Sequence, residues 1–295
     1  MRLHVVDGTY ELFRAHYSKR PDHTTPDGRP LKATLGVVSS MVALLQDAEE
    51  DVTHLAMAFD NPIRSFRNDL YDGYKTEDGI DPDLRAQFDP VEEAARALGI
   101  VVWSMDKYEA DDALATATVK YAKGVSQIRI LTPDKDLGQC VRGTKVVQVD
   151  RLRERVIDED ELRKTRGFGP ESIPDWLALV GDTADGIPGL RGFGDKSTSA
   201  LLAVYPHLED VPKDASAWTP KIRGAEGLAA TLREGKKEAL LYRKLATVVT
   251  DVPLRESLAD LRWKGVDVAA WSAFCAKVGA SKDFRERAIR ASDGR

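Results

Sequence analysis

The sequence predicts an α/β fold in which a parallel central sheet has helices on both faces and is followed by a helical region. Up to about residue 150, short apolar runs alternate with amphipathic stretches, which is the pattern of strands joined by crossover helices. From about residue 160, helical stretches alternate with glycine-rich turns and no further strand is indicated. We therefore expect an α/β domain spanning residues 1–160 and a helical domain spanning residues 161–295.

Short apolar runs are expected to form the strands, at residues 3–6, 55–59, 100–103, 128–132 and 146–149. Three of these runs are followed by acids, namely Asp7, Asp60, and the pair Asp134 and Asp136. A single Asp after a strand is usually a turn residue or a helix N-cap, and Asp150 is interpreted as a turn residue. Because open α/β sheets bind ligands at the carboxyl ends of their strands, the three acidic endings indicate one shared site.

Amphipathic helices are expected at residues 34–46 and 89–98, and another begins at Glu109 and ends near residue 124. This last helix opens with Glu109, Asp111 and Asp112. Acids at a helix N-terminus often only cap the helix and complement its dipole. Their combination with the acids that follow the strands favours a common site instead.

The stretch from residue 64 to residue 83 is polar, interrupted by Gly and Pro, and long for a simple connection. Such a loop at the carboxyl edge of a sheet is either a substrate-handling loop or a solvated connection. The sequence alone leaves both alternatives open.

The helical domain contains a helix, a glycine-rich turn and a second helix within residues 172–204. The first helix ends in Gly181-Asp182-Thr183-Ala184-Asp185, and the turn before the second reads Gly192-Phe193-Gly194-Asp195-Lys196-Ser197. Backbone N–H groups in such a turn can bind a phosphate oxygen, and Lys196 adds positive charge. Further helices are expected over residues 221–249 and 263–288, with Trp271 and Phe274 in the core.

The composition indicates a cytoplasmic protein that is a monomer by default. The first strand begins close to Met1, no apolar run approaches the length of a membrane span, and Cys140 and Cys275 lack metal-like spacing. The net charge of −5 is unusual for a nucleic-acid-binding protein. Nucleic acid would have to bind through bound cations or through local basic patches. These patches are Arg142, Lys145, Arg151, Arg153, Arg155, Arg163, Lys164 and Arg166, and then Lys221, Arg223, Lys236, Lys237, Arg243 and Lys244.

Acids at the expected convergence points are numerous enough to require cations. They are Asp7, Asp60, Glu109, Asp111, Asp112, Asp134, Asp136, Asp182 and Asp185. Without cations, like charges so close together would raise several pKa values. An all-oxygen ligand set favours Mg²⁺ or Mn²⁺ over Zn²⁺, and two such ions about 4 Å apart are suited to in-line attack on phosphodiesters.

Eight motifs in this order carry a family resemblance. They are Val6-Asp7-Gly8, Phe59-Asp60, Ser65-Phe66-Arg67, Gly73-Tyr74-Lys75, Tyr108-Glu109-Ala110-Asp111-Asp112, Leu131-Thr132-Pro133-Asp134-Lys135-Asp136-Leu137, Gly181-Asp182-Thr183-Ala184-Asp185 and Gly192-Phe193-Gly194-Asp195-Lys196. From about residue 3 to residue 253 the chain resembles the 5′-nucleases. This family includes flap endonucleases and the 5′→3′ exonuclease domain of bacterial DNA polymerase I. It looks like a stand-alone form, because no polymerase follows.

The resemblance implies a PIN-like sheet, an arch-like loop at about residues 64–98, and a helix–hairpin–helix. It implies a structure-dependent 5′→3′ exonuclease or flap endonuclease that acts in replication and repair. DNA with 5′ flaps, nicks or 5′ ends would be hydrolysed by a two-metal mechanism that gives 5′-phosphate products.

The resemblance also implies roles for individual residues. Asp7, Asp60, Glu109 and Asp111 would serve one metal, and Asp134, Asp136 and Asp185 the second, with Asp182 close by and Asp112 behind the ligands. Lys75 would meet the scissile phosphate, with Tyr74 and Arg67 as further catalytic candidates. Duplex DNA would contact the hairpin, which holds a K⁺ ion in relatives, through Gly192, Gly194, Lys196 and Ser197.

Two departures from the family pattern leave alternatives open. Asp78 stands where bacterial relatives usually carry an arginine, and Gly186 where they often have asparagine. An acidic arch should grip a 5′ flap less well, whereas we expect the change at Gly186 to be mild. The alternatives are a DNA-structure-binding protein with weak or no turnover and an enzyme that removes RNA from RNA–DNA hybrids. A small-molecule phosphatase is more remote.

Overall fold

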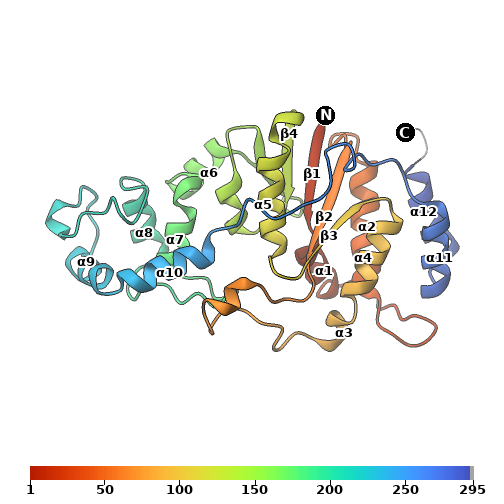
Figure 1. The fold of residues 1–295 in the computed structure, drawn as a ribbon, viewed down its shortest axis with the longest axis horizontal. Helices are drawn as coiled ribbons and strands as arrows, with labels where there is room; N and C mark the ends of the chain where they lie inside the picture. Colours follow the sequence, from red (N-terminus) through yellow and green to blue (C-terminus); the bar gives the residue numbers. More distant parts are fainter. Residues whose placement is uncertain (293–295) are drawn as a thin grey trace. The chain divides into compact units, whose positions relative to one another are not determined.

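The computed structural model describes residues 1–292, which divide into two compact units. The sheet unit comprises Met1–Arg64, Glu77–Thr132 and the chain from Thr250 onward. The helical unit comprises Ser65–Thr76 and Pro133–Val249. Figure 1 shows the chain coloured from its N-terminus to its C-terminus, so that the segments of each unit can be followed.

The sheet unit contains parallel strands in the order β3-β2-β1-β4. Their bounds are Arg2–Asp7 for β1, His54–Asp60 for β2, Val101–Met105 for β3 and Gln127–Leu131 for β4. Every residue of β2 is buried, as expected for a parallel strand covered on both faces. The predicted parallel sheet is therefore confirmed, and the carboxyl ends of its strands share one edge.

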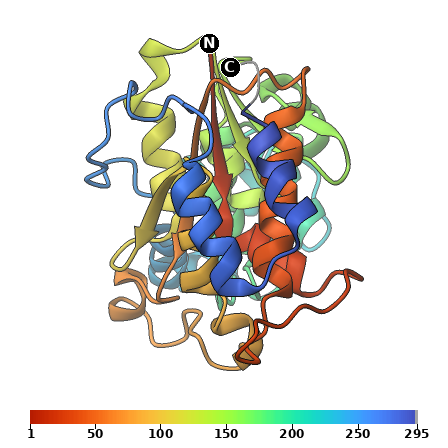
Figure 2. The same ribbon diagram turned by 90° about the vertical axis from the view of Figure 1, so that its right-hand side faces the viewer.

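Helices cover both faces of this sheet, as predicted. Figure 2 shows α5 (Ala110–Lys120) on one side and α2 (Lys32–Gln46) on the other. The short α3 (Pro82–Arg85) precedes α4 (Phe88–Ala97), which packs against α2. Right-handed crossovers explain the arrangement, because β2 and β3 lie to one side of β1 and β4 lies to the other.

Helix α1 (Gly8–His16) was not expected, because the sequence indicates Asp7 as a member of the shared acidic site rather than as a helix N-cap. Its carboxylate instead accepts a hydrogen bond from the Tyr10 N–H and caps the helix. Gly8 is required at this point, since a Cβ there would lie 2.7 Å from the Ala58 carbonyl oxygen.

The last helices of the sheet unit are α11 (Val268–Val278) and α12 (Lys282–Arg290). Trp271 and Phe274 are buried and stacked, with ring centroids 5.6 Å apart, so their prediction as core residues is confirmed. The single helical stretch expected over residues 263–288 is wrong in its extent. Asp267 caps the start of α11, and Gly279 ends it in the left-handed conformation.

The helical unit begins with an antiparallel hairpin of β5 (Val146–Asp150) and β6 (Arg155–Ile157), followed by α6 (Glu159–Arg166). Neither β6 nor α6 was expected. Strand β6 is largely exposed and α6 buries only Leu162, so neither has an apolar pattern. Asp150 is a turn residue, as predicted, and accepts hydrogen bonds from the N–H groups at positions 152 and 153.

The remaining helices of this unit are α7 (Ile173–Val180), α8 (Asp195–Leu202), α9 (Ala225–Glu234) and α10 (Lys236–Ala246), visible in green to blue in Figure 1. Two expectations need correction. Helix α8 begins at Asp195, five residues before the apolar run that predicted it. The stretch 221–249 is two helices, which meet at Gly235. Within residues 1–292, no helix has the length and apolar character needed to cross a membrane.

Candidate metal centre

The sheet unit carries a first group of carboxylates at the carboxyl edge of its strands. Asp7 ends β1, and its two oxygens accept from the Tyr10 N–H at 2.8 Å and from the Thr132 hydroxyl at 3.0 Å. Asp60 ends β2, and its carboxylate accepts from the Ala110 N–H at 2.6 Å. The start of α5 is thereby tied to the end of β2, and the partial positive charge of the helix N-terminus stabilises the carboxylate.

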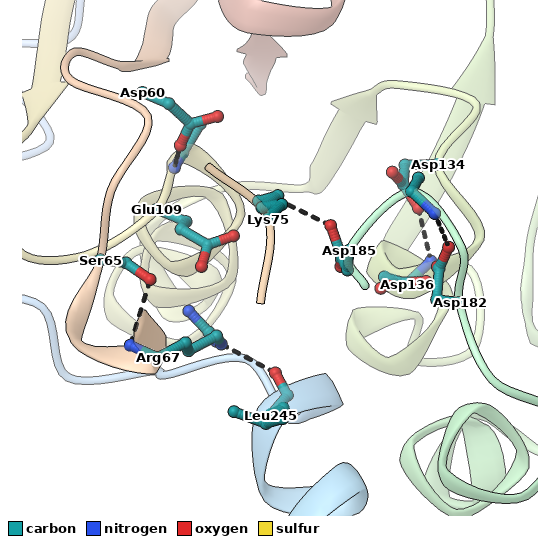
Figure 3. A network of polar contacts seen from close by, with 12 residues as sticks. Asp60, Ser65, Arg67, Lys75, Glu109, Asp134, Asp136, Asp182, Asp185 and Leu245 are labelled. Atoms are coloured by element: carbon teal, nitrogen blue, oxygen red, sulfur yellow. Dashed lines mark hydrogen bonds and ion pairs between the residues drawn. The ribbon is translucent and has the colours of Figure 1, made fainter. Parts of the chain in front are cut away.

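Glu109 and Asp112 form a capping box at the start of α5. The Glu109 N–H donates to Asp112 at 3.0 Å, while the Glu109 side chain accepts from the backbone at position 112. Asp112 is fully buried, so its carboxylate holds the helix start in place. Figure 3 shows Asp60 and Glu109 on these neighbouring elements. Asp111 is half-buried in the same turn.

The helical unit carries a second group of carboxylates. One oxygen from each of Asp136, Asp182 and Asp185 lies within 4.8 Å of the others. Asp134 caps the short 3₁₀ helix η3 (Lys135–Cys140), where its carboxylate accepts from the Asp136 N–H at 3.0 Å. Figure 3 shows these four side chains gathered from two loops. The sequence predicted all four, and the structure brings them together.

Asp136 is the least compensated member of this group. It is 5% exposed, and its Oδ1 atom is buried without a hydrogen-bond partner. Burial raises the pKa of Asp136 well above its usual value, and the charges of Asp134 and Asp185 raise it further. A buried carboxylate oxygen that, within residues 1–292, accepts no hydrogen bond and has only the Lys135 ammonium 3.6 Å away, among other aspartates, fits a divalent cation that prefers oxygen ligands.

Two lysines balance part of this negative charge. The Lys135 ammonium contacts Asp182 and lies 3.6 Å from Asp136, while the Lys75 Nζ lies 2.9 Å from Asp185 (Figure 3). Burial opposes the charged form of Lys135, but the charge of Asp136 and the hydrogen bond to Asp182 outweigh it, so its pKa is raised. Sequence reasoning missed Lys135, whose only signal was its position between two acids.

A glycine turn after α7 positions Asp182 and Asp185. The backbones of Asp182 and Ile187 exchange two hydrogen bonds of 2.8 Å, which close the turn around Asp185. The Lys75 N–H donates to the Asp185 carbonyl at 3.1 Å. Gly186, at φ +74°, faces the same segment, and a Cβ there would lie only 2.1 Å from the Gly73 carbonyl oxygen. The loop thus fits directly against residues 73–75. This close approach predicts that a larger residue at position 186 would disturb the structure strongly, in contrast to the mild effect expected from the sequence.

The other two catalytic candidates lie in the packed interior. Tyr74 is 4% exposed in a cluster with Trp176 and Leu177. Arg67 is 2% exposed and donates to the carbonyl oxygens of Leu245 at 2.8 Å and Thr247 at 3.0 Å (Figure 3). These contacts give Arg67 a positioning role at the end of α10, and a catalytic role for either residue stays a prediction.

The predicted hairpin connects α7 and α8. Gly192 has φ +89°, and the Gly194 N–H donates to the Ser197 hydroxyl at 3.2 Å in a capping box. Lys196 and Ser197 therefore lie in the first turn of α8 rather than before it. The Trp176 indole N–H donates to Asp195 at 3.1 Å and ties the two helices together.

A groove of about 460 Å³ connects this hairpin with η3. Its cationic side chains are Lys135, Arg155, Arg166 and Lys196. Some of the other basic residues predicted to bind nucleic acid are paired within the unit, and so is Arg155 of the groove, which lies 3.3 Å from Glu161. Arg163 contacts Glu159 and Glu171, for example. Sequence reasoning could not identify which of the basic residues line the groove.

Comparisons with known proteins agree with this geometry. Residues 2–167 match the family model described as the 5′-3′ exonuclease N-terminal resolvase-like domain. Residues 168–269 match the 5′-3′ exonuclease C-terminal SAM fold.

Among curated relatives, the 5′-3′ exonuclease of Aquifex aeolicus is 31% identical over 268 residues, which cover 90% of this chain and 88% of the relative. The 5′-3′ exonuclease of Buchnera aphidicola is 33% identical over 251 residues, covering 84% and 82%. DNA polymerase I of Pseudomonas aeruginosa is 36% identical over 261 residues, which cover 85% of this chain but only 28% of the polymerase.

Solved structures share the fold. T5 5′-exonuclease with bound divalent metal ions (zinc) superposes with a TM-score of 0.64 at 16% identity, covering 98% of this chain and 97% of that one. The catalytic core of Rad2 in complex with a DNA substrate gives 0.63 at 17% identity, covering 98% and 92%.

Proposed function

The chain belongs to the 5′-3′ exonuclease family, and from this we propose that it is a structure-dependent 5′→3′ exonuclease or flap endonuclease. It would hydrolyse DNA phosphodiesters at 5′ flaps, nicks or 5′ ends and leave 5′-phosphates, in replication and repair. The observation that carries the proposal is the group of Asp136, Asp182 and Asp185, with a buried oxygen of Asp136 that has no hydrogen-bond partner.

We assign the carboxylates to two Mg²⁺ or Mn²⁺ ions. Asp7, Asp60, Glu109 and Asp111 would hold one, and Asp134, Asp136 and Asp185 the other, with Asp182 beside them. Such a pair, when bound, activates water and stabilises both the attacking and the leaving oxygen. The buried Asp112 would keep the start of α5 in place without reaching an ion.

Lys75 is the residue of this chain proposed to act on the phosphate. Its side chain is 26% exposed, and its ammonium is held by Asp185 rather than enclosed in the core. On substrate binding, the ammonium would exchange Asp185 for a phosphate oxygen and stabilise the charge that develops there. Tyr74, packed beneath it, would fix the backbone from which Lys75 extends.

The groove between η3 and α8 would hold the sugar–phosphate backbone. Its four cations support this assignment, and one of them, Lys135, lies 3.6 Å from Asp136. The hairpin would contact phosphates through the N–H groups near Gly192 and Gly194, and a K⁺ ion bound there belongs to the same proposal. Because phosphate contacts release counterions, DNA affinity should fall steeply as salt is raised.

Product mapping on a 5′-labelled flap with Mg²⁺ or Mn²⁺ tests the proposal. We expect Asp134→Asn combined with Asp136→Asn to abolish cleavage while duplex binding in a gel shift stays mostly intact. Asp150→Asn is the matched control, because Asp150 caps the β5–β6 turn and pairs with Arg153 at 2.8 Å but is no metal-ligand candidate, so its variant should cleave normally. Wild-type cleavage by the double variant would contradict the assignment.

The second candidate is a DNA-structure-binding protein without turnover, which the acidic loop favours. Part of that acidity has internal partners. Glu77 accepts from the Ile63 N–H at 2.9 Å and lies 3.2 Å from Arg85, and Asp81 caps α3. Binding of the flap without any product would favour this candidate. A flap with an RNA 5′ segment, run in the same assay, separates DNA cleavage from removal of RNA.

A cytoplasmic location is also proposed. Cys140 and Cys275 are both free and buried, which suits a reducing compartment.

A further inference from the structure

A second pocket lies on the helical unit and shares no residue with the carboxylate group or the cationic groove. It has a volume of about 360 Å³ and is formed by α9, α10 and the segment after α8. Its floor is apolar and includes Leu208, Val211, Ala229, Leu232 and Ala239. Nothing in the proposed cleavage reaction uses this pocket.

The pocket is built before any ligand arrives. Buried Asp175 on α7 accepts from Arg243 of α10 at 2.9 Å and from His207 at 3.0 Å. The Trp218 indole N–H donates to the Pro212 carbonyl at 2.8 Å. These bonds fix the segment after α8 against α7 and α10, so the pocket keeps its shape, with Leu232 and Leu240 half-buried at its surface and Leu208, Val211, Ala229 and Ala239 buried beneath them.

The rim of the pocket is positively charged. Lys213, Arg233 and Lys236 surround it, and within residues 1–292 neither lysine makes an ion pair. The acid at the rim, Glu209, is already compensated, since Arg243 donates to its two oxygens at 2.6 and 2.7 Å. That hydrogen bonding lowers the pKa of Glu209 to about 2. Arg233 pairs with Asp214 at 4.0 Å, which leaves the two lysines as the cations of the rim without an ion pair in the described part of the chain. An apolar floor beside these lysines is complementary to an apolar side chain flanked by acids.

We propose that this pocket binds a short acidic segment of a partner protein and takes one large apolar side chain of that segment. The volume is at the low end of ligand pockets, which span roughly 300–1,000 Å³, so it suits one anchor side chain rather than a whole helix. A DNA strand fits less well, because no aromatic side chain lines the pocket on which a base could stack.

Fluorescence anisotropy with labelled octapeptides tests this proposal. The probe carries a central Leu-Phe pair with two aspartates on each side. One control peptide has alanines at the centre, and another has lysines in place of the aspartates. We expect the probe to bind with an affinity at least tenfold higher than that of either control peptide. The affinity of the probe should fall as the salt concentration is raised.

A matched pair of protein variants localises the binding. Lys236→Glu should lower the affinity for the probe at least tenfold. Lys237 is the next residue of α10 and is not part of the pocket, so Lys237→Glu should change the affinity less than twofold. Both glutamates would stand in the first turn of α10, where a negative charge favours the helix, so both variants should stay folded. Unchanged melting temperatures check this.

The proposal is overturned if the probe fails to bind up to millimolar concentration, if both variants behave alike, or if an unlabelled oligonucleotide displaces the probe. The peptide measurements contain no divalent metal, so the competing oligonucleotide is not cleaved and their outcome does not depend on whether the chain is a nuclease.

Discussion

At the scale of single residues, Asp136 concentrates the chemistry of the helical unit. It is buried, one of its oxygens has no hydrogen-bond partner, and three further aspartates surround it. A carboxylate in that environment destabilises the metal-free fold, because its charge is neither hydrated nor fully paired. A cation held by the same oxygens would turn this destabilisation into a stabilisation. The effect of Asp136 on protein stability therefore reports whether a cation is bound.

Asp136→Asn should therefore stabilise the protein in the presence of EDTA, by about 1–3 kcal/mol. The amide occupies the same space without the charge. Added Mg²⁺ should raise the melting temperature of the wild type more than that of the variant. Thermal unfolding with EDTA and with Mg²⁺ measures both effects. A variant that is less stable than the wild type in EDTA would show that the charge of Asp136 is compensated by other groups.

The candidate acids could be predicted from the sequence because strand ends and helix starts place side chains in a regular way. The burial of Tyr74 and Arg67 could not be predicted, because Tyr74 belongs to the same motif as the half-buried Lys75 and Arg67 lies in a neighbouring motif. Whether a motif residue faces the substrate or the core depends on packing against α7 and α10, which are distant in sequence.

At the scale of elements, the fit between two loops determines where Lys75 lies. The loop after α7 approaches residues 73–75 so closely that only glycine fits at position 186. The hydrogen bond from the Lys75 N–H to the Asp185 carbonyl depends on this approach.

Gly186→Asn should therefore displace Lys75 and lower the cleavage rate by up to about 10²-fold, since small misplacements of catalytic groups have effects of that size. Duplex affinity should be unchanged. Single-turnover kinetics and a gel shift separate the two. Gly79→Asn is the matched control, because Gly79 also has a positive φ (+84°) but a Cβ there would meet no other atom within 4 Å. Equal rates for both variants and the wild type would show that the close approach has no catalytic consequence.

A second element-scale feature links β1 and β4. His4 on β1 lies 2.9 Å from Glu50, and Arg129 on β4 lies 2.7 Å from the same carboxylate. Burial lowers the pKa of His4 below 6.5, and the hydrogen bond from His4 lowers the pKa of Glu50 to about 2. Both groups thus bind protons less readily in the folded state than in the unfolded state.

Stability should therefore fall on acidification, through His4 below pH 6.5 and through Glu50 as the pH falls from 4.5 towards about 2. Glu50→Gln should lower stability at neutral pH and flatten the loss in the Glu50 window. Urea unfolding across a pH series measures this, with Glu49→Gln as a control at an exposed neighbour. If the free energy of unfolding of Glu50→Gln falls as steeply below pH 4.5 as that of the wild type, Glu50 does not cause the loss of stability in acid.

Elements with an apolar pattern were predictable, and those without one were not. The buried strand β2 and the helix α2 stand out in the sequence because most of their residues are apolar. Strand β6 and helix α6 have almost no buried face, and their formation depends on pairing with β5 and on caps such as Asp158. Helix α1 was hidden because its cap, Asp7, is also a candidate ligand.

At the scale of the whole molecule, the proposed ligands come from two compact units of a discontinuous chain. Asp7 and Asp60 belong to the sheet unit, and Asp136 and Asp185 to the helical unit. The two-ion proposal requires both groups to act on one phosphodiester. Loss of either group should then remove cleavage entirely, whereas each unit would keep its own fold.

Anomalous diffraction from a crystal soaked in Mn²⁺ tests this central claim most directly. We expect two manganese peaks about 4 Å apart, one contacting Asp7, Asp60 or Glu109 and the other contacting Asp136 or Asp185. A single peak, or peaks only at surface acids away from these residues, would contradict it.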